Sequence, residues 1–416
     1  MKILIPILLT VFVQSQGLYE SFESFDKDSR NRYIATTTYE FDVSKAEGNN
    51  RVVEFKHVTG DITVEGKPIT TVTIIERMKI RTKSRSIAED YFKSEKAEVS
   101  KSGEGHIEFR REKNGPRRLK ISYDYDVVVP QNYNLSMKTS GGDIDVSYIS
   151  GEAYLKTSGG NVDVSHLTGR LTAKTSGGDI TLDKVKGVAN VRTSGGDIEV
   201  NDSDGKLEGT TSGGDVDITY CKAEVDMHTS GGNIDFKDII GSKIYGRTSG
   251  GNIDVTGIEG DVDVHTSGGN IEAMDIKGEF EGSASGGNIE FDRIMGHIDV
   301  NTSGGNIIGE HVVGRIIGKT SGGRIEIEKI WNRSFDDHEI YLKTSGGKIE
   351  LRLPSDFPAT IDATVINRRS TGAIDSEFPL QITLDDNDVL ANGSINGGKF
   401  SVKLKTSHDS ISIEKD

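Results

Sequence analysis

The hexapeptide Thr139-Ser140-Gly141-Gly142-Asp143-Ile144 is the first of twelve copies of one phrase, and nine of the eleven intervals between copies are 18 residues long. A fixed period of this kind is the sequence signature of a repeat architecture, in which each unit packs on its neighbours. The later copies begin at Thr157, Thr175, Thr193, Thr211, Thr229, Thr248, Thr266, Ala284, Thr302, Thr320 and Thr344. We therefore expect an array of 18-residue coils.

Apolar residues recur at fixed positions of each coil, numbered here from its first residue. Position six is Ile or Val in every copy, and positions eight and eleven are mostly apolar. The alternation around them predicts two short strands per coil, with Gly-Gly bending the chain between strands. Stacked coils bury identical positions on one another, so we predict an all-β fold, a parallel β-solenoid.

An antiparallel hairpin meander is the alternative fold. If Gly-Gly is a two-residue hairpin turn, the residue before each Thr faces position seven, which pairs Lys138 with Asp145 and Lys156 with Asp163. Such opposite charges across strands are favourable, whereas a stack places a column of acids a few ångströms apart. The solenoid stays preferred because a meander of many short strands must close or double over to bury its apolar face.

The N-terminus has the pattern of a secretory signal. Lys2 supplies a positive charge, Ile3–Val13 is an apolar stretch too short to span a bilayer, and small residues follow it. Residues 1–16 are therefore predicted to be a signal peptide. We expect an exported protein, periplasmic, at the outer surface or extracellular, with no transmembrane segment.

The rest of the chain divides into three predicted regions. Residues 17–133 are expected to form a β-rich capping region with one helix, Ile87–Val99, for which Ser86 is the N-cap. Residues 134–350 form the repeat solenoid, and residues 351–416 form a C-terminal β cap, which a repeat array needs to cover its last apolar face.

Charge and cysteine content restrict the function. The formal net charge is −15, which argues against nucleic-acid binding because phosphate neutralisation needs a surplus of Lys and Arg. Cys221 is the single cysteine, so no intrachain disulfide can form, and its place at apolar position eleven predicts a buried side chain.

Two places where the repeat is absent or interrupted are candidate partner contacts. Six extra residues separate the copies at Thr320 and Thr344, and they can form a protruding contact loop or a hydrophobic flap. The candidate contacts there are Trp331, Phe335 and His338. A basic face at period two, solvated and neutralised by nearby acids or open to an anionic partner, is the other candidate, with Lys79, Arg81, Lys83 and Arg85.

Cofactor and catalytic chemistry find little support in the sequence. Asp or Asn at position five follows Gly-Gly as in calcium-binding nonapeptides, but one oxygen per coil fits turn chemistry better than a calcium site. His228 and His265, two coils apart with Arg247 between them, make a poor zinc site. A glycosidase needs two differently tuned carboxylates, whereas the position-seven acids are all equivalent. No catalytic, cofactor or metal residue is therefore predicted, and calcium stays a remote alternative.

The chain resembles the bacterial putative-adhesin repeat family, a domain of unknown function. The resemblance is carried by Val58-Thr59-Gly60-Asp61-Ile62, by Tyr123–Pro130 leading into Leu135–Gly142, and by Asn396-Gly397-Gly398. It implies a β-solenoid, an exported or envelope-associated location and no established activity; some relatives are linked to envelope-stress responses.

The sequence as a whole predicts a non-enzymatic, adhesin-like or structural protein that presents a rigid β rod to an envelope component, a surface polymer or a protein partner. A polysaccharide-processing β-helix enzyme and an envelope-stress sensing component are the alternatives. A row of Thr hydroxyls that binds ice or glycan is a further idea, but alternation places these threonines on the inner side with position six.

Overall fold

The structure is a computed structural model that describes residues 19–28, 32–48, 51–111, 119–368 and 370–416. Internal contacts divide the chain into two compact units, Met1–Thr210 and Thr211–Asp416. The predicted signal peptide, residues 1–16, lies outside the described residues.

The first unit opens with an antiparallel sheet. In it β1 pairs with β2, β2 with β5, and β5 with β8. The bounds of these strands are β1 Tyr19–Lys27, β2 Arg32–Asp42, β5 Thr71–Arg81 and β8 Lys120–Pro130. Side chains alternate between buried and partly exposed along β2 and β5, as expected when one face of a sheet is covered.

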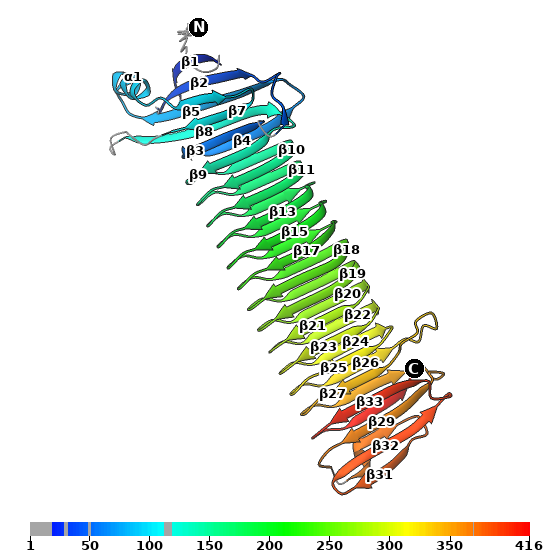
Figure 1. Cartoon of the computed structure of the whole chain (residues 1–416). Coiled ribbons are helices and arrows are strands. Elements are labelled where there is room, and N and C mark those ends of the chain that lie inside the picture. The colour runs from blue at the N-terminus through cyan, green and yellow to red at the C-terminus, as the bar shows by residue number, and fades with distance from the viewer. Residues whose placement is uncertain (1–18, 29–31, 49–50, 112–118, 369) are drawn as a thin grey trace. The chain divides into compact units, whose positions relative to one another are not determined.

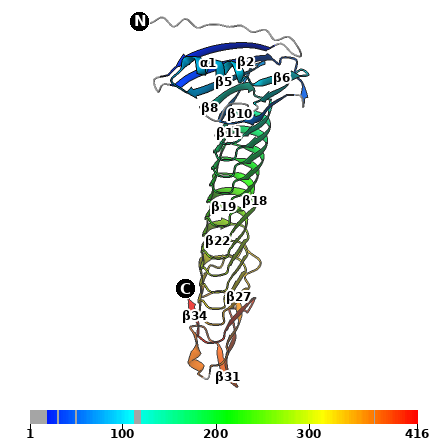
Figure 2. The same cartoon turned by 90° about the vertical axis from the view of Figure 1, so that its left-hand side faces the viewer.

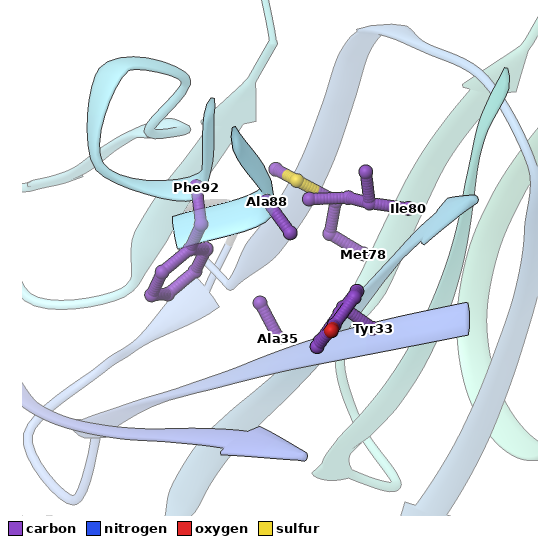
Figure 3. Packing of buried hydrophobic residues seen from close by; sticks show 6 residues of the cluster. All are labelled: Tyr33, Ala35, Met78, Ile80, Ala88 and Phe92. Atoms are coloured by element: carbon purple, nitrogen blue, oxygen red, sulfur yellow. The ribbon is translucent and has the colours of Figure 1, made fainter. Parts of the chain in front are cut away.

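The one α-helix among the described residues covers part of that face. Ala88 and Phe92 of α1 (Arg85–Ser94) join a buried cluster with residues of β2 and β5 (Figure 3). The strand residues of this cluster are Tyr33, Ala35, Met78 and Ile80. The helix therefore buries its short apolar stripe against the sheet.

The bounds predicted for this helix were wrong at both ends. Ser84, and not Ser86, is the N-cap: its hydroxyl accepts a hydrogen bond from the amide of Ile87 at 3.4 Å. Glu89 pairs with Arg85 at 2.7 Å on the surface of the helix. Residues from Glu98 onward belong to β6 (Glu98–Ser102), because their backbone pairs with β7 (His106–Arg110).

Coil stacking begins at Val58–Ile62, whose Thr59-Gly60-Asp61-Ile62 resembles a shortened copy of the repeat. β4 (Asp61–Lys67) lies between β8 and β10 with parallel pairing to both, so Ile62 lies opposite Ile144. β3 (Val52–Val58) and β9 (Asn134–Thr139) make the second strand column, which β10 continues. The capping region and the repeats therefore share one hydrogen-bonded stack within this unit.

Each coil of the first unit lies parallel to the next, with a shift of 18 residues. Ile144 lies opposite Val162, and Asp145 opposite Asp163. The strands are β10 Ile144–Lys156, β11 Val162–Lys174, β12 Ile180–Asp183, β13 Lys186–Arg192, β14 Ile198–Asn201 and β15 Asp204–Thr210. This register makes the fold a β-solenoid, and the hairpin alternative is wrong because the Lys–Asp pairs that favoured it do not lie opposite each other.

The second unit repeats this arrangement with twelve parallel strands in two columns (Figures 1 and 2). Its strands from β16 to β27 are Val216–Thr219, Lys222–His228, Ile234–Thr248, Ile253–Thr266, Ile271–Lys277, Phe280–Ala284, Ile289–Met295, Ile298–Thr302, Ile307–Val312, Ile316–Lys319, Ile325–Lys329 and Ile340–Lys343. Position six is fully buried throughout, for example at Ile253, Ile271 and Ile289.

The C-terminal strands extend the stack and then close it. β33 pairs in parallel with β27, and β34 with β28, while β29, β32 and β31 add antiparallel pairs. These strands are β28 Ile349–Leu353, β29 Ala359–Val365, β30 Ile374–Ser376, β31 Gln381–Asp385, β32 Asp388–Ile395, β33 Phe400–Thr406 and β34 Ile411–Lys415. The Thr406 hydroxyl donates to the Gly347 carbonyl at 2.8 Å, the bond that the first Thr of each repeat makes, so the segment that begins at Thr406 adds a further coil.

Candidate binding surfaces

The first Thr of each coil is part of the scaffold. Thr175 is buried, and its hydroxyl donates to the carbonyl oxygen of Gly160 in the preceding coil at 2.8 Å. The same hydroxyl accepts from the amide of Gly178 at 3.3 Å. The Thr column therefore faces inward, as predicted, and its hydroxyls are used within the wall and are not presented to a ligand.

Replacing Thr175 by Val should lower the free energy of unfolding by about 1 to 3 kcal/mol, because it leaves a buried carbonyl and a buried amide without their partner. Urea denaturation followed by circular dichroism measures this. Thr168→Val, at an exposed residue of β11, is the matched control and should change stability by less than about 0.5 kcal/mol. Equal effects of the two changes would contradict the assigned role.

Position five forms a second ladder within the wall. The side-chain oxygen of Asp143 accepts from the backbone amide of Asn161 at 2.8 Å, and that of Asn161 accepts from the amide of Asp179 at 2.9 Å. In the second unit Asn252 and Asn270 are linked in the same way at 2.9 Å. Asp and Asn both accept such a bond, which explains why they alternate here.

Position seven places carboxylates in columns on the outer face. Asp235, Asp254 and Glu272 lie opposite one another on successive strands. Partial burial, followed by repulsion from Glu272 and Asp235, raises the pKa of Asp254. In the first unit, partial burial and the carboxylate of Asp163 likewise raise the pKa of Asp145. The neighbours that shift these pKa values are therefore other carboxylates, and the field at the column favours a cation.

Position ten is a corner that the sequence does not reveal. In most coils a non-glycine residue there adopts left-handed backbone geometry, with φ of 59° at Tyr148, 52° at His166 and 49° at His311. These side chains are exposed, and the rings of Tyr148 and His166 stack with centroids 4.7 Å apart. The corner thus presents a variable outward side chain in most coils.

The extra residues between β26 and β27 form a loop that projects from the coils (Figure 1), while side chains at its base pack back onto the fold. Trp331 is half-buried and meets the ring of Phe357 edge-on at 6.1 Å. His338 is fully buried, contacts the rings of Phe357 and Phe400, and its Nε2 lies 2.9 Å from the carbonyl oxygen of Asn332. The inner side of this segment is therefore a hydrophobic flap. Phe335 is half-buried beside His338.

A buried lysine lies under this flap. Lys329 takes the place of an apolar residue in the position-eleven column, opposite Val312, and is fully buried. Its Nζ donates to the carbonyl oxygen of Gly314. Burial lowers the pKa of Lys329 to about 7, and burial also lowers the pKa of His338. Sequence reasoning missed this residue.

The predicted basic face is divided between two elements. Lys79 and Arg81 belong to β5, which ends at Arg81, so Lys83 and Arg85 do not continue the strand. Lys79 forms an ion pair with Asp124, and Arg85 is the first residue of α1. The four residues therefore do not form one strand face, and acids neutralise part of the charge.

Two further predictions concern the burial of Cys221 and the absence of a transmembrane segment. Cys221 is buried, as predicted, and its Sγ lies 3.2 Å from the carbonyl oxygen of Thr219. Among the described residues, no helix has the length and apolar character needed to cross a bilayer.

Comparison with known proteins identifies a family for part of the chain. Residues 121–237 match the model of the family described as Toastrack DUF4097. No curated protein matches the chain. One similar solved structure is named a putative cell adhesion protein from Clostridium sporogenes; it shares 8% identity over 92% of this chain and 100% of that chain, with a TM-score of 0.16.

A second solved structure is named a putative lipid binding protein from Parabacteroides distasonis, with 18% identity over 76% of this chain and 96% of that chain and a TM-score of 0.16. TM-scores this low support no argument from either structure. The family match runs from β8 to the start of β18 and includes Tyr123–Pro130 and Leu135–Gly142, whereas the other segments on which the resemblance was based, Val58–Ile62 and Asn396–Gly398, lie outside it. Residues 121–237 of this chain are therefore similar to the Toastrack DUF4097 family, a repeat family of unknown function.

Proposed function

We propose that this is a non-enzymatic, exported protein whose solenoid coils present columns of carboxylates to a cationic component of the cell envelope. The observation that carries the proposal is the column Asp235, Asp254 and Glu272, where the electrostatic neighbours that raise the pKa of Asp254 are themselves carboxylates. Bringing a polycation to such a column relieves this repulsion, and a partner with several positive charges can contact several coils at once.

The inner residues of the repeat support a binding role for the outer ones. Thr, the second Gly and Asx are committed to bonds or close contacts between coils, so the outward positions seven and ten are free to vary. Position-seven acids are related by the parallel register and are therefore alike, whereas carboxylate-based hydrolysis of a polysaccharide needs two unlike ones.

Binding to immobilised polylysine tests the proposal. The purified chain should bind polylysine and not dextran sulfate, and binding should weaken as salt rises, because exposed charges are screened. The variant Asp235→Asn, Asp254→Asn, Glu272→Gln should bind about tenfold more weakly, at roughly 0.5 kcal/mol for each exposed charge removed.

The charge-matched control removes three acids that already have basic partners. Glu208 pairs with Lys206, Glu259 with Lys277, and Asp275 with Arg293. The variant Glu208→Gln, Glu259→Gln, Asp275→Asn should therefore bind within about twofold of the parent. Equal losses in the two triple variants would show that total charge, and not the column, governs binding. Release of reducing sugars from polysaccharides by the parent protein would overturn the non-enzymatic part.

A further inference from the structure

One group of side chains in the second unit departs from the repeat. Position nine varies along the repeats, with Ser or Thr in four coils and a lone acid at Asp183, but three consecutive coils carry an acid there. The Ser and Thr examples are Ser147, Ser165, Thr219 and Thr256, and the acids are Asp292, Glu310 and Glu328. His311 follows at the left-handed corner beside them, with φ of 49°. This is a local departure of the kind that a dedicated site requires.

The imidazole of His311 lies between two of these carboxylates. Its Nδ1 is 2.9 Å from Oδ1 of Asp292, and its Nε2 is 3.7 Å from Oε1 of Glu328. One ligand atom each from Asp292, Glu310 and His311 lie within 4.8 Å of one another. Ligands of one Zn²⁺ bind at about 2.0 to 2.2 Å, so small side-chain rotations bring these three atoms onto one ion.

Two arginines hold the outer oxygens of the carboxylates. Arg293 contacts Oδ2 of Asp292, and Arg352 lies 3.4 Å from Oε2 of Glu328. In both cases the other oxygen of the carboxylate faces His311. The side chains of Asp292 and Glu328 are only 23% and 22% exposed, whereas that of His311 is 48% exposed. The carboxylates are therefore fixed in place, and the ring remains accessible from solvent.

The charge around this group is strongly negative. Arg293 is shared with Asp275 through bonds of 2.6 and 3.0 Å, and Arg352 is shared with Glu414 at 3.4 Å. A hollow of about 100 Å³ adjoins the group, and its lining adds further carboxylates. These are Glu326 and Glu350, beside Glu310 and Glu328. Glu326 also pairs with Arg324, and Glu350 with Lys348. Even with these partners, four basic side chains face seven carboxylates around the group, so a divalent cation is favoured.

A second histidine and carboxylate group shows what a neutralised arrangement looks like. In the first unit, Glu54, His106 and Glu108 also have ligand atoms within 4.8 Å of one another. There the ammonium of Lys56 bridges Glu54 at 3.0 Å and Glu108 at 2.9 Å. A lysine thus already occupies the place that a metal would take.

We propose that Asp292, Glu310 and His311 bind a divalent transition-metal ion of the zinc class. Imidazole together with carboxylates suits Zn²⁺, whereas Ca²⁺ and Mg²⁺ prefer ligand sets made of oxygen alone. His311 binds through Nδ1, and Glu328 accepts a hydrogen bond from the opposite ring nitrogen and so orients the ring, which is the usual arrangement around a metal-bound histidine. Water completes the coordination on the open side.

Isothermal titration of the full chain with ZnCl₂ tests the site. One equivalent should bind, and CaCl₂ or MgCl₂ should compete poorly. His311→Asn removes the imidazole while keeping a residue that tolerates left-handed geometry, and it should weaken binding by at least about tenfold. Asp292→Asn should have a similar effect. The Co²⁺-loaded chain should show visible ligand-field absorption that His311→Asn loses, which reports coordination independently of heat.

The chain offers matched controls. His166 has the same corner geometry, with φ of 52°, in a coil where position nine is Ser165. His166→Asn and His106→Asn should therefore leave zinc affinity within about twofold of the parent. Undiminished binding in His311→Asn, or an equal loss in His166→Asn, would overturn the proposal, as would the absence of zinc binding to the parent at millimolar metal.

Discussion

Replacing Lys329 by Met should raise the free energy of unfolding at pH 7, on the order of 3 to 5 kcal/mol. Lys329 is fully buried in a column that is otherwise apolar, with Ile294 and Val312 at the equivalent positions. Burial lowers its pKa to about 7 from an unperturbed 10.5, and each pKa unit corresponds to about 1.4 kcal/mol. Met keeps the length of the side chain and needs no hydration, so it removes this cost.

The stability gained by Lys329→Met should decrease as the pH rises above 7. Between about pH 7 and 10.5 the unfolded chain holds a proton on Lys329 that the folded chain has released, so the contribution of this residue to stability rises with pH. The parent is therefore penalised most at and below pH 7. The difference between Lys329→Met and the parent should be largest there and shrink toward pH 10.

Guanidinium denaturation at several pH values measures the difference directly. Lys319→Met is the matched control, because Lys319 is an exposed residue of a neighbouring strand, and it should change stability by less than about 0.5 kcal/mol with no such pH dependence. A Lys329→Met variant less stable than the parent would mean that the bond from Nζ to the Gly314 carbonyl outweighs the desolvation of the ammonium.

The coil architecture could be predicted because its requirements are written at the same position in every copy. Ile253 and Ile271 stack on each other, and Thr248 and Thr266 make the same bonds, so repetition itself carries the information. The possible pairing of Lys138 with Asp145 favoured hairpins because the preference for opposite charges across strands considers only two strands at a time. In the solenoid, burial of whole coils outweighs the repulsion between stacked acids.

Three features could not be predicted from the sequence, each for its own reason: the left-handed corner at position ten, the buried Lys329 and the group around His311. Positive φ is uncommon for a tyrosine such as Tyr148, and although histidine is enriched in this conformation, the residue type changes from coil to coil and so does not mark the corner. Lys329 falls in the apolar column only because the register shifts between Gly309 and Val312. The acids Asp292, Glu310 and Glu328 share one repeat position in the sequence, but their proximity to His311 depends on the backbone geometry of that corner.

The second glycine of the repeat phrase is the position where one added methyl group should do most harm. A Cβ built on Gly178 would lie 2.1 Å from the carbonyl oxygen of Gly160 and 2.4 Å from its carbonyl carbon. These are backbone atoms of the preceding coil and cannot rotate away. Gly178→Ala must therefore push two coils apart, which should lower the free energy of unfolding by at least about 3 kcal/mol.

The first glycine is the matched control, one residue away in the same bend. A Cβ on Gly177 would meet Gly159 no closer than 3.7 Å, which is ordinary contact. Neither glycine has the positive φ that would exclude alanine on conformational grounds. Gly177→Ala should therefore change stability by less than about 1 kcal/mol in the same denaturation experiment. Equal losses would mean that backbone freedom in the bend, and not close packing between coils, requires glycine at both positions.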